Sequence, residues 1–174
     1  EVFTQDRFRR LAEKGRESFE TMRATKNGNR VPVEVSAVLI KEGNTDAVFS
    51  IERDLTERKK AEEALRDAHR QWEDMFQAIG HPTIILDLSH RILAANPATE
   101  KLAGRPASNI IGKYCYQVFH ASEHVSEGCP MEKVLQSGVL QTEVMEMKTP
   151  KGVFLVSCTP VFDDAGQLAK VIHV

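Results

Sequence analysis

This sequence of 174 residues lacks the features that mark several large classes of protein. Its three cysteines are an odd number without framework spacing, which argues against a disulfide scaffold and fits a reducing cytoplasm. No apolar run approaches the roughly 20 residues that span a bilayer, and no charged-then-apolar leader opens the chain. We therefore expect a cytoplasmic fragment without direct membrane contact, whose parent chain could still be tethered to a membrane elsewhere.

A strong charge and a catalytic signature are missing as well. The formal net charge of −2 leaves no broad basic surface, so we expect no nucleic-acid partner. The chain contains no nucleophile elbow, phosphate-binding glycine loop or metalloprotease helix. These absences predict that the fragment itself is not an enzyme.

What the sequence does contain is an internal repeat. Residues 35–53 align without a gap with residues 156–174, at a constant offset of 121. In both copies an apolar, strand-like run meets a polar turn and then a second such run, which is typical of a hairpin. Alternating stretches upstream, at residues 18–25 and 140–149, predict a third antiparallel strand in each copy.

The two copies differ in length. Residues 80–174 read as two strands, several short helices and three strands, which predicts an α+β domain with a five-stranded antiparallel sheet and helices on one face. Residues 1–54 contain only the final three strands, so we expect the C-terminal half of a first, truncated domain. The chain is then a piece of a longer tandem array.

Residues 55–79 connect the copies and contain no proline. Apolar residues recur there at alternating steps of four and three, the spacing of a coiled-coil seam: Ala61, Leu65, Ala68, Trp72, Met75 and Ile79. The alternative is a single amphipathic helix lying on its own domain. Because three strands without their partners leave an apolar face open, we expect a homodimer in which residues 1–70 supply most of the contact.

Three stretches together resemble the PAS sensory-domain family: ILAANPATEKLAG at 92–104, NIIGK at 109–113 and DLTERKKAEEAL at 54–65. The resemblance implies a PAS fold whose helical face encloses a small cavity, and we take Asn96 and Phe119 as candidate cavity residues. It also implies that Asp54 and Thr56 form the exit from the last strand into a signalling helix, where they transmit the signal. A plain helix N-cap is the alternative role for this pair.

Similar PAS domains occur in sensor histidine kinases, diguanylate cyclases and transcriptional activators. The resemblance therefore implies a sensory and dimerisation module of a bacterial-type signal-transduction protein, most simply a histidine kinase of a two-component system. Such a module would relay the ligand or redox state of its cavity through its connecting helices. The small-molecule ligand is unknown, and the output domain would lie on the same parent chain.

A Cys-x4-His-x3-His-x4-Cys spacing provides the alternative function. Cys115, His120, His124 and Cys129 are residue types that bind zinc or iron, so they predict a metal- or redox-cofactor-binding domain. The stretch resembles a PAS subgroup that carries a Cys-x-x-Cys-Pro motif, but Ser126 replaces its first cysteine.

Simpler interpretations of this cluster are a buried thiol with partly exposed histidines, or a cysteine pair that joins on oxidation. Flavin and haem are not expected. The reactive cysteine of the flavin-binding members is missing, and the helix around residues 131–140 carries no histidine.

Overall fold

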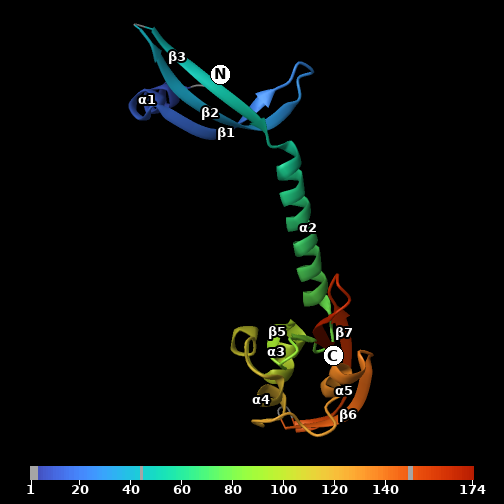
Figure 1. The fold of residues 1–174 in the computed structure, drawn as a ribbon. Coiled ribbons are helices and arrows are strands. Elements are labelled where there is room, and N and C mark those ends of the chain that lie inside the picture. The colour runs from blue at the N-terminus through green and yellow to red at the C-terminus, as the bar shows by residue number, and fades with distance from the viewer. Residues whose placement is uncertain (1–3, 44, 149–150) are drawn as a thin grey trace. The chain divides into compact units, whose positions relative to one another are not determined.

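The structure is a computed structural model that describes residues 4–43, 45–148 and 151–174. It divides into two compact units, residues 1–70 and residues 71–174 (Figure 1). The division falls within the connecting helix. Each unit has its own sheet.

The first unit is a three-stranded antiparallel sheet with one helix. Its elements are α1 (Gln5–Lys14), β1 (Arg16–Ala24), β2 (Arg30–Glu42) and β3 (Thr45–Asp54), in the sheet order β1-β2-β3. Alternate side chains of β2, namely Val33, Val35 and Ala37, are buried on one face, as the period of two in a strand requires. The predicted strands are confirmed, whereas α1 was not predicted.

Much apolar surface of this unit is open to solvent. Every side chain described in β3 is exposed. Large apolar side chains with substantial exposure in the three strands are Met22, Val38, Ile40, Val48, Phe49 and Ile51.

The helix α2 (Thr56–Ala78) leads along the chain from the first unit into the second. Its seam residues are exposed: Leu65 is 73% exposed, and Trp72, Met75 and Ile79 also keep large exposed fractions. Phe76 is the buried residue of the helix, and its ring stacks on Trp72 at 5.4 Å between centroids. None of the helices in the described part of the chain combines the length and the apolar character needed to cross a bilayer.

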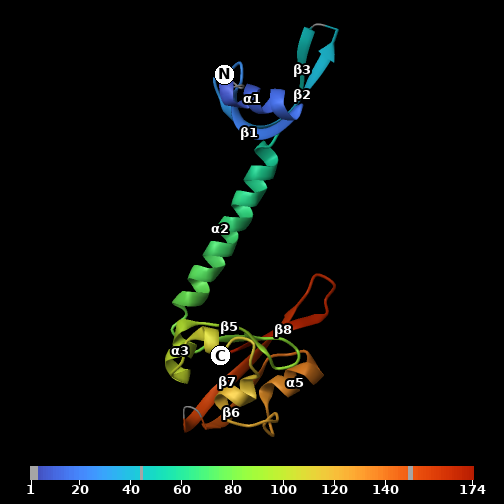
Figure 2. The same ribbon diagram turned by 90° about the vertical axis from the view of Figure 1, so that its left-hand side faces the viewer.

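In the described part of the second unit, nine elements follow α2. They are β4 (Ile84–Leu86), β5 (Ile92–Ala95), α3 (Pro97–Ala103), η1 (Ala107–Asn109), α4 (Cys115–Phe119), α5 (Pro130–Ser137), β6 (Gln141–Lys148), β7 (Lys151–Phe162) and β8 (Leu168–His173). Figure 2 shows β6, β7 and β8 as the final, orange-to-red elements of this unit. The five strands pair antiparallel in the order β5-β4-β8-β7-β6, so the predicted α+β architecture is confirmed.

Short capped helices pack with the sheet in one hydrophobic core. Asn96 caps α3, Pro97 occupies its first turn, and Gly104 ends it with a φ of 63°. The core joins strand residues such as Leu86 and Val156 to helix residues such as Val118, Met131 and Val134.

The internal repeat is visible in both sheets. Strand β2 begins at Arg30 and β7 begins at Lys151, which reproduces the offset in the sequence. In each unit the last three strands are sequential neighbours, β1-β2-β3 and β6-β7-β8. The repeat therefore reflects one strand arrangement used twice.

Candidate functional site

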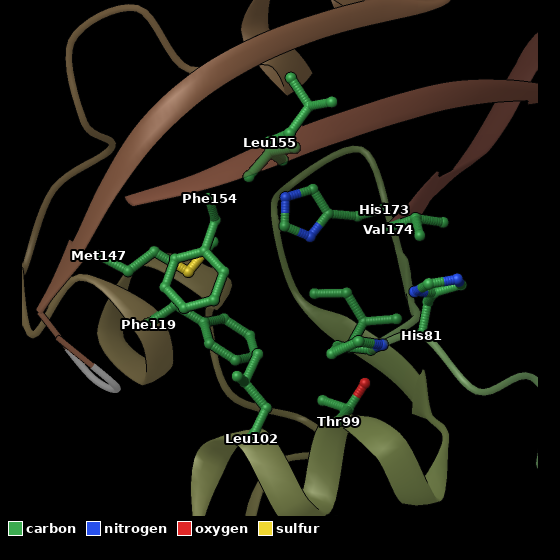
Figure 3. A pocket seen from close by; sticks show the side chains of 12 residues that line it. His81, Thr99, Leu102, Phe119, Met147, Phe154, Leu155, His173 and Val174 are labelled. Carbon is green, nitrogen blue, oxygen red and sulfur yellow. The ribbon is translucent and has the colours of Figure 1, made fainter. Parts of the chain in front are cut away.

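The second unit contains a cavity of about 220 Å³. Most of its wall is apolar, formed by Ile84, Leu102, Phe119, Met147, Phe154 and Val156 among others. Figure 3 shows Leu102 and Thr99 rising from α3 on one side and Phe154 extending toward them from β7 on the other. The volume exceeds the ~150 Å³ of an apolar cavity that binds benzene but lies below the ~300 Å³ at which pockets for drug-sized ligands begin.

His173 is a polar group that points into this cavity from β8, and the polar residues His81 and Thr99 also line it (Figure 3). Burial, followed by the neighbouring His120 and His90, lowers the pKa of His173 to about 4. The imidazole is therefore neutral at neutral pH, with one nitrogen able to donate and the other able to accept. Within the described residues it has no hydrogen-bond partner, so this capacity is available to a bound molecule.

The two predicted cavity residues occupy different positions. Phe119 lines the cavity, whereas Asn96 is fully buried and is not among the lining residues. Its Oδ1 accepts hydrogen bonds from the Thr83 N–H (3.0 Å), the Thr99 N–H (2.9 Å) and the Thr99 hydroxyl (2.8 Å). Its Nδ2 donates to the carbonyls of Ile79 (3.0 Å) and His81 (2.8 Å). Asn96 thus holds the segment that leaves α2 against the start of α3.

Only part of the predicted Cys/His cluster comes together. Cys115, His120 and Cys129 line a small compartment of about 10 Å³, and Ser126 lies on its wall. His124 is exposed and does not line it. In the portion of the chain that the structure describes, no three histidine, cysteine, aspartate or glutamate side chains form a group that could hold a metal ion. The zinc or iron site stays a prediction, which metal analysis of the purified, reduced protein would decide.

The cysteines are protected by burial. All three are free thiols, and burial, followed by the nearby Cys129, raises the pKa of Cys115 to about 12. Burial likewise raises the pKa of Cys158, in β7, to about 12. Burial also lowers the pKa of His120. Burial therefore favours the uncharged forms of Cys115, Cys158 and His120.

His90 is a site residue that the sequence did not indicate. It is 6% exposed and has a φ of 67°, a left-handed conformation that costs a non-glycine residue on the order of 1–3 kcal/mol. Its Nε2 lies 2.6 Å from Oε1 of Glu132, and its Nδ1 lies 3.8 Å from Sγ of Cys115. The available signal was the tight turn after Asp87, which has histidine at a position that favours glycine.

The predicted exit pair forms part of a larger joint in the first unit. The Thr56 main-chain N–H donates to Oδ1 of Asp54 at 2.7 Å, at the start of α2. Glu20 of β1 accepts from Arg58 at 3.0 Å and from Lys59 at 2.5 Å. The Lys59 ammonium holds the pKa of the Glu20 carboxyl below its ordinary value. Strand β1 is therefore connected to the first turn of α2 by contacts that the sequence did not indicate.

The depressed pKa of His173 predicts a specific dependence of stability on pH. Between pH 6.5 and pH 4 the unfolded chain binds a proton at His173 that the folded chain does not bind, so the free energy of unfolding falls as the pH falls. A tenfold change in proton affinity is worth about 1.4 kcal/mol, and the loss across this window reaches about 3 kcal/mol. His173→Phe should remove this pH-dependent loss of stability. Urea unfolding of the second unit, measured at several pH values, checks the prediction.

Val171→Ala is the matched control for this prediction. Val171 is a fully buried, uncharged residue of the same strand. Its truncation should lower stability by a similar amount at every pH. An unchanged pH slope in His173→Phe would show that His173 is not neutral and buried as described.

Comparison with protein families identifies both units. Residues 76–174 match the family model described as PAS fold, and residues 2–57 match the model described as PAS domain. Two curated relatives are similar over shorter segments. The methyl sulfide methyltransferase-associated sensor of Methanosarcina acetivorans is 40% identical over 62 residues, which are 36% of this chain and 6% of that protein. The probable diguanylate cyclase DgcE of Escherichia coli is 30% identical over 83 residues, 48% of this chain and 8% of its own.

Solved structures show the same fold at low sequence identity. An RNA-binding light-oxygen-voltage receptor matches 97% of this chain and 80% of its own length, with a TM-score of 0.50 and 12% identity. The PAS domain of an HTR-like protein from Haloarcula marismortui matches 66% of this chain and 95% of its own, with a TM-score of 0.51 and 14% identity. Because the PAS fold match alone covers more than half of the residues, the chain belongs to the PAS family.

Proposed function

We propose that residues 80–174 are a sensory domain that binds a small molecule in the cavity, and that residues 55–79 relay its occupancy within a signal-transduction protein. The observation that carries this proposal is the largely apolar cavity into which the imidazole of His173 points. Residues 1–54 then belong to a neighbouring PAS domain of the same parent chain. In this proposal the fragment senses the ligand and transmits the signal, and an output domain of the parent chain catalyses the signalling reaction.

The cavity wall defines the chemical class of the ligand. Its carbon-rich lining favours an apolar body, and its volume limits that body to about the size of one aromatic ring. A charged ligand would lose hydration against this apolar wall, and the neutral His173 offers it no opposite charge. The proposed ligand is therefore a small, mainly apolar, neutral molecule with one group that exchanges a hydrogen bond with His173.

Hydrogen bonds of Asn96 connect the cavity wall to the end of α2. His81 and Thr99 line the cavity, and both are hydrogen-bonded to Asn96. Asn96 also binds the carbonyl of Ile79, directly after α2. A ligand that displaces His81 or Thr99 would therefore change the hydrogen bonds at the end of α2, which supports transmission along the connecting helix.

The parent is proposed to be a sensor histidine kinase of a two-component system, with a diguanylate cyclase as the alternative. The similarity to a sensor and to a probable diguanylate cyclase supports a signalling parent of either kind. Autophosphorylation of the full-length parent by ATP would support the kinase. Synthesis of cyclic diguanylate without autophosphorylation would show instead that the parent is a diguanylate cyclase.

The cavity proposal predicts a preference between two ligands of similar shape. Phenol and toluene share one ring and differ by a hydroxyl in place of a methyl group. Since a net hydrogen bond contributes about 1 kcal/mol, calorimetry should show phenol binding the second unit roughly three- to tenfold more tightly than toluene. His173→Phe should abolish the preference. Absence of binding by both compounds would contradict the ligand-site proposal, and equal binding to wild type would contradict the role of His173.

We also propose that the chain forms the homodimer expected from its sequence, with the seam residues of α2 in contact between two chains. This predicts that a charge placed in the seam separates the chains. Leu65 is largely exposed in the single chain, so Leu65→Glu should leave the fold intact while placing like charges opposite each other in a pair of helices. Sedimentation should show a dimer for wild type at micromolar concentration and a monomer for Leu65→Glu. Ala64→Glu, off the seam in the same helix, should remain dimeric, and a monomeric wild type would contradict the proposal.

The transmission proposal predicts different effects at the two exit residues. Asp54→Ala removes the acceptor of the Thr56 N–H at a cost of about 1 kcal/mol, whereas Thr56→Ala keeps that main-chain bond. Asp54→Ala should therefore speed amide exchange in the first turn of α2 more than Thr56→Ala or the control Asp54→Asn. In the full-length parent, Asp54→Ala should alter the activity of the output domain, while the affinity of the second unit for its ligand stays unchanged. If Asp54→Ala keeps the basal output and the response to signal of the wild type, Asp54 and Thr56 act only as a helix cap.

A further inference from the structure

A buried imidazole is held between a carboxylate and a thiol in the second unit. His90 lies in the turn after β4, Cys115 begins α4, and Glu132 lies in the first turn of α5. Glu132 is 2.6 Å from Nε2 of His90, and Sγ of Cys115 is 3.8 Å from its Nδ1. Three separate segments of the chain therefore converge on one ring.

The hydrogen-bond partners determine the arrangement of protons. A carboxylate only accepts, so the Nε2–H of His90 donates to Glu132. In the neutral ring, Nδ1 then carries a lone pair, and the Cys115 S–H can donate to it. This is the arrangement of an activated nucleophile: a thiol, a base within reach of its proton, and a third group that orients the base.

The backbone of His90 indicates that the imidazole itself is required. The turn is already fixed by Asp87, whose Oδ1 accepts from the N–H groups of Ser89 (2.9 Å) and Arg91 (2.8 Å). With a φ of 67°, glycine would suit position 90 better than histidine. A side chain kept in an unfavourable conformation and buried between two partners points to a role for its ring.

The space beside Cys115 limits what can react there. The compartment of about 10 Å³ is near the ~10–15 Å³ that a single water molecule needs. Cys129 and His120 lie on the same wall. Bulky disulfides and alkylating reagents are excluded, whereas an oxidant close to the size of water needs little movement to enter.

We propose that Cys115 is a peroxide-reactive thiol whose proton is accepted by His90, with Glu132 as the positioning residue. The sulfur attacks one oxygen of hydrogen peroxide, so that an S–O bond forms and the O–O bond breaks. The thiol proton passes to Nδ1 of His90 and then to the departing hydroxide, which leaves as water. Cys115 is oxidised to the sulfenic acid as the peroxide is reduced. This site shares Phe119 and His173 with the wall of the proposed ligand cavity, but the reaction does not require a ligand there.

Burial of the thiol does not oppose this step. A group with a high pKa becomes a nucleophile when an adjacent base takes its proton during the attack, as in serine–histidine pairs. Cys158 is the internal control. Its pKa is also raised to about 12, but among the described residues no imidazole lies within hydrogen-bonding distance of its sulfur.

The test measures the rate at which each thiol is lost in the folded, reduced protein treated with hydrogen peroxide. Each sample is unfolded in dimedone at the end of its reaction time, because the folded compartment excludes this reagent. Mass spectrometry of the trapped peptides then identifies sulfenic acid at Cys115, and a disulfide with Cys129 counts as a product of the same step. Cys115 should react at least tenfold faster than Cys158. His90→Asn, which tolerates the same backbone conformation without supplying the base, should slow Cys115 about tenfold or more. His90→Gly, which favours the turn, should do the same without loss of thermal stability.

Glu132 requires a readout that a purely structural role would not change. The ¹⁵N shifts of the His90 ring should report an Nε2–H tautomer in wild type and a mixture of tautomers in Glu132→Ala. Equal rates for Cys115 and Cys158 in wild type would overturn the proposal. An unchanged Cys115 rate in folded His90→Asn and His90→Gly would overturn it as well.

Discussion

The carboxamide of Asn96 is the interaction on which the second unit most depends. Its five hydrogen bonds join the segment after α2 to the start of β4 and to the first turn of α3. Three of these bonds, those from Thr83 and Thr99, lie in the buried interior, and each of their polar groups would cost about 1–3 kcal/mol if left unpaired. Because His81 and Thr99 are among the partners, the same side chain sets two parts of the cavity wall. Cavity shape and helix exit are therefore coupled by one amide.

Two chemical environments meet at His173. It lines the apolar cavity on one side and the compartment of Cys115 on the other. The apolar side selects small neutral molecules, because charged ones would lose hydration without compensation. The thiol side admits only molecules close to the size of water. Phe119 also lies on both walls, so a molecule in either space contacts residues that bound the other.

The features predicted from the sequence are those that local patterns determine. Alternation, turns and the repeat gave the strands of both sheets, and Asn96, Pro97 and Gly104 mark the ends of α3 as capping rules require. Helix α1 was missed because most of its residues are polar and Leu11 alone is buried, so few apolar residues mark its inner face. Spacing grouped His124 with Cys115, but residues between α4 and α5 lie in a loop whose path spacing does not determine. The contact of His90 with Glu132, 42 positions apart, arises only from tertiary packing.

Amide hydrogen exchange of the second unit, measured by NMR with and without saturating phenol, tests most directly whether the cavity is coupled to the helix exit. The N–H groups of Thr83 and Thr99 both donate to Asn96, so their exchange rates report the integrity of its hydrogen bonds. The account predicts that phenol changes exchange at Thr83 and Thr99 together with β8. Bound phenol that alters β8 and leaves both threonine amides unchanged would contradict it, because the cavity would then have no connection to the end of α2.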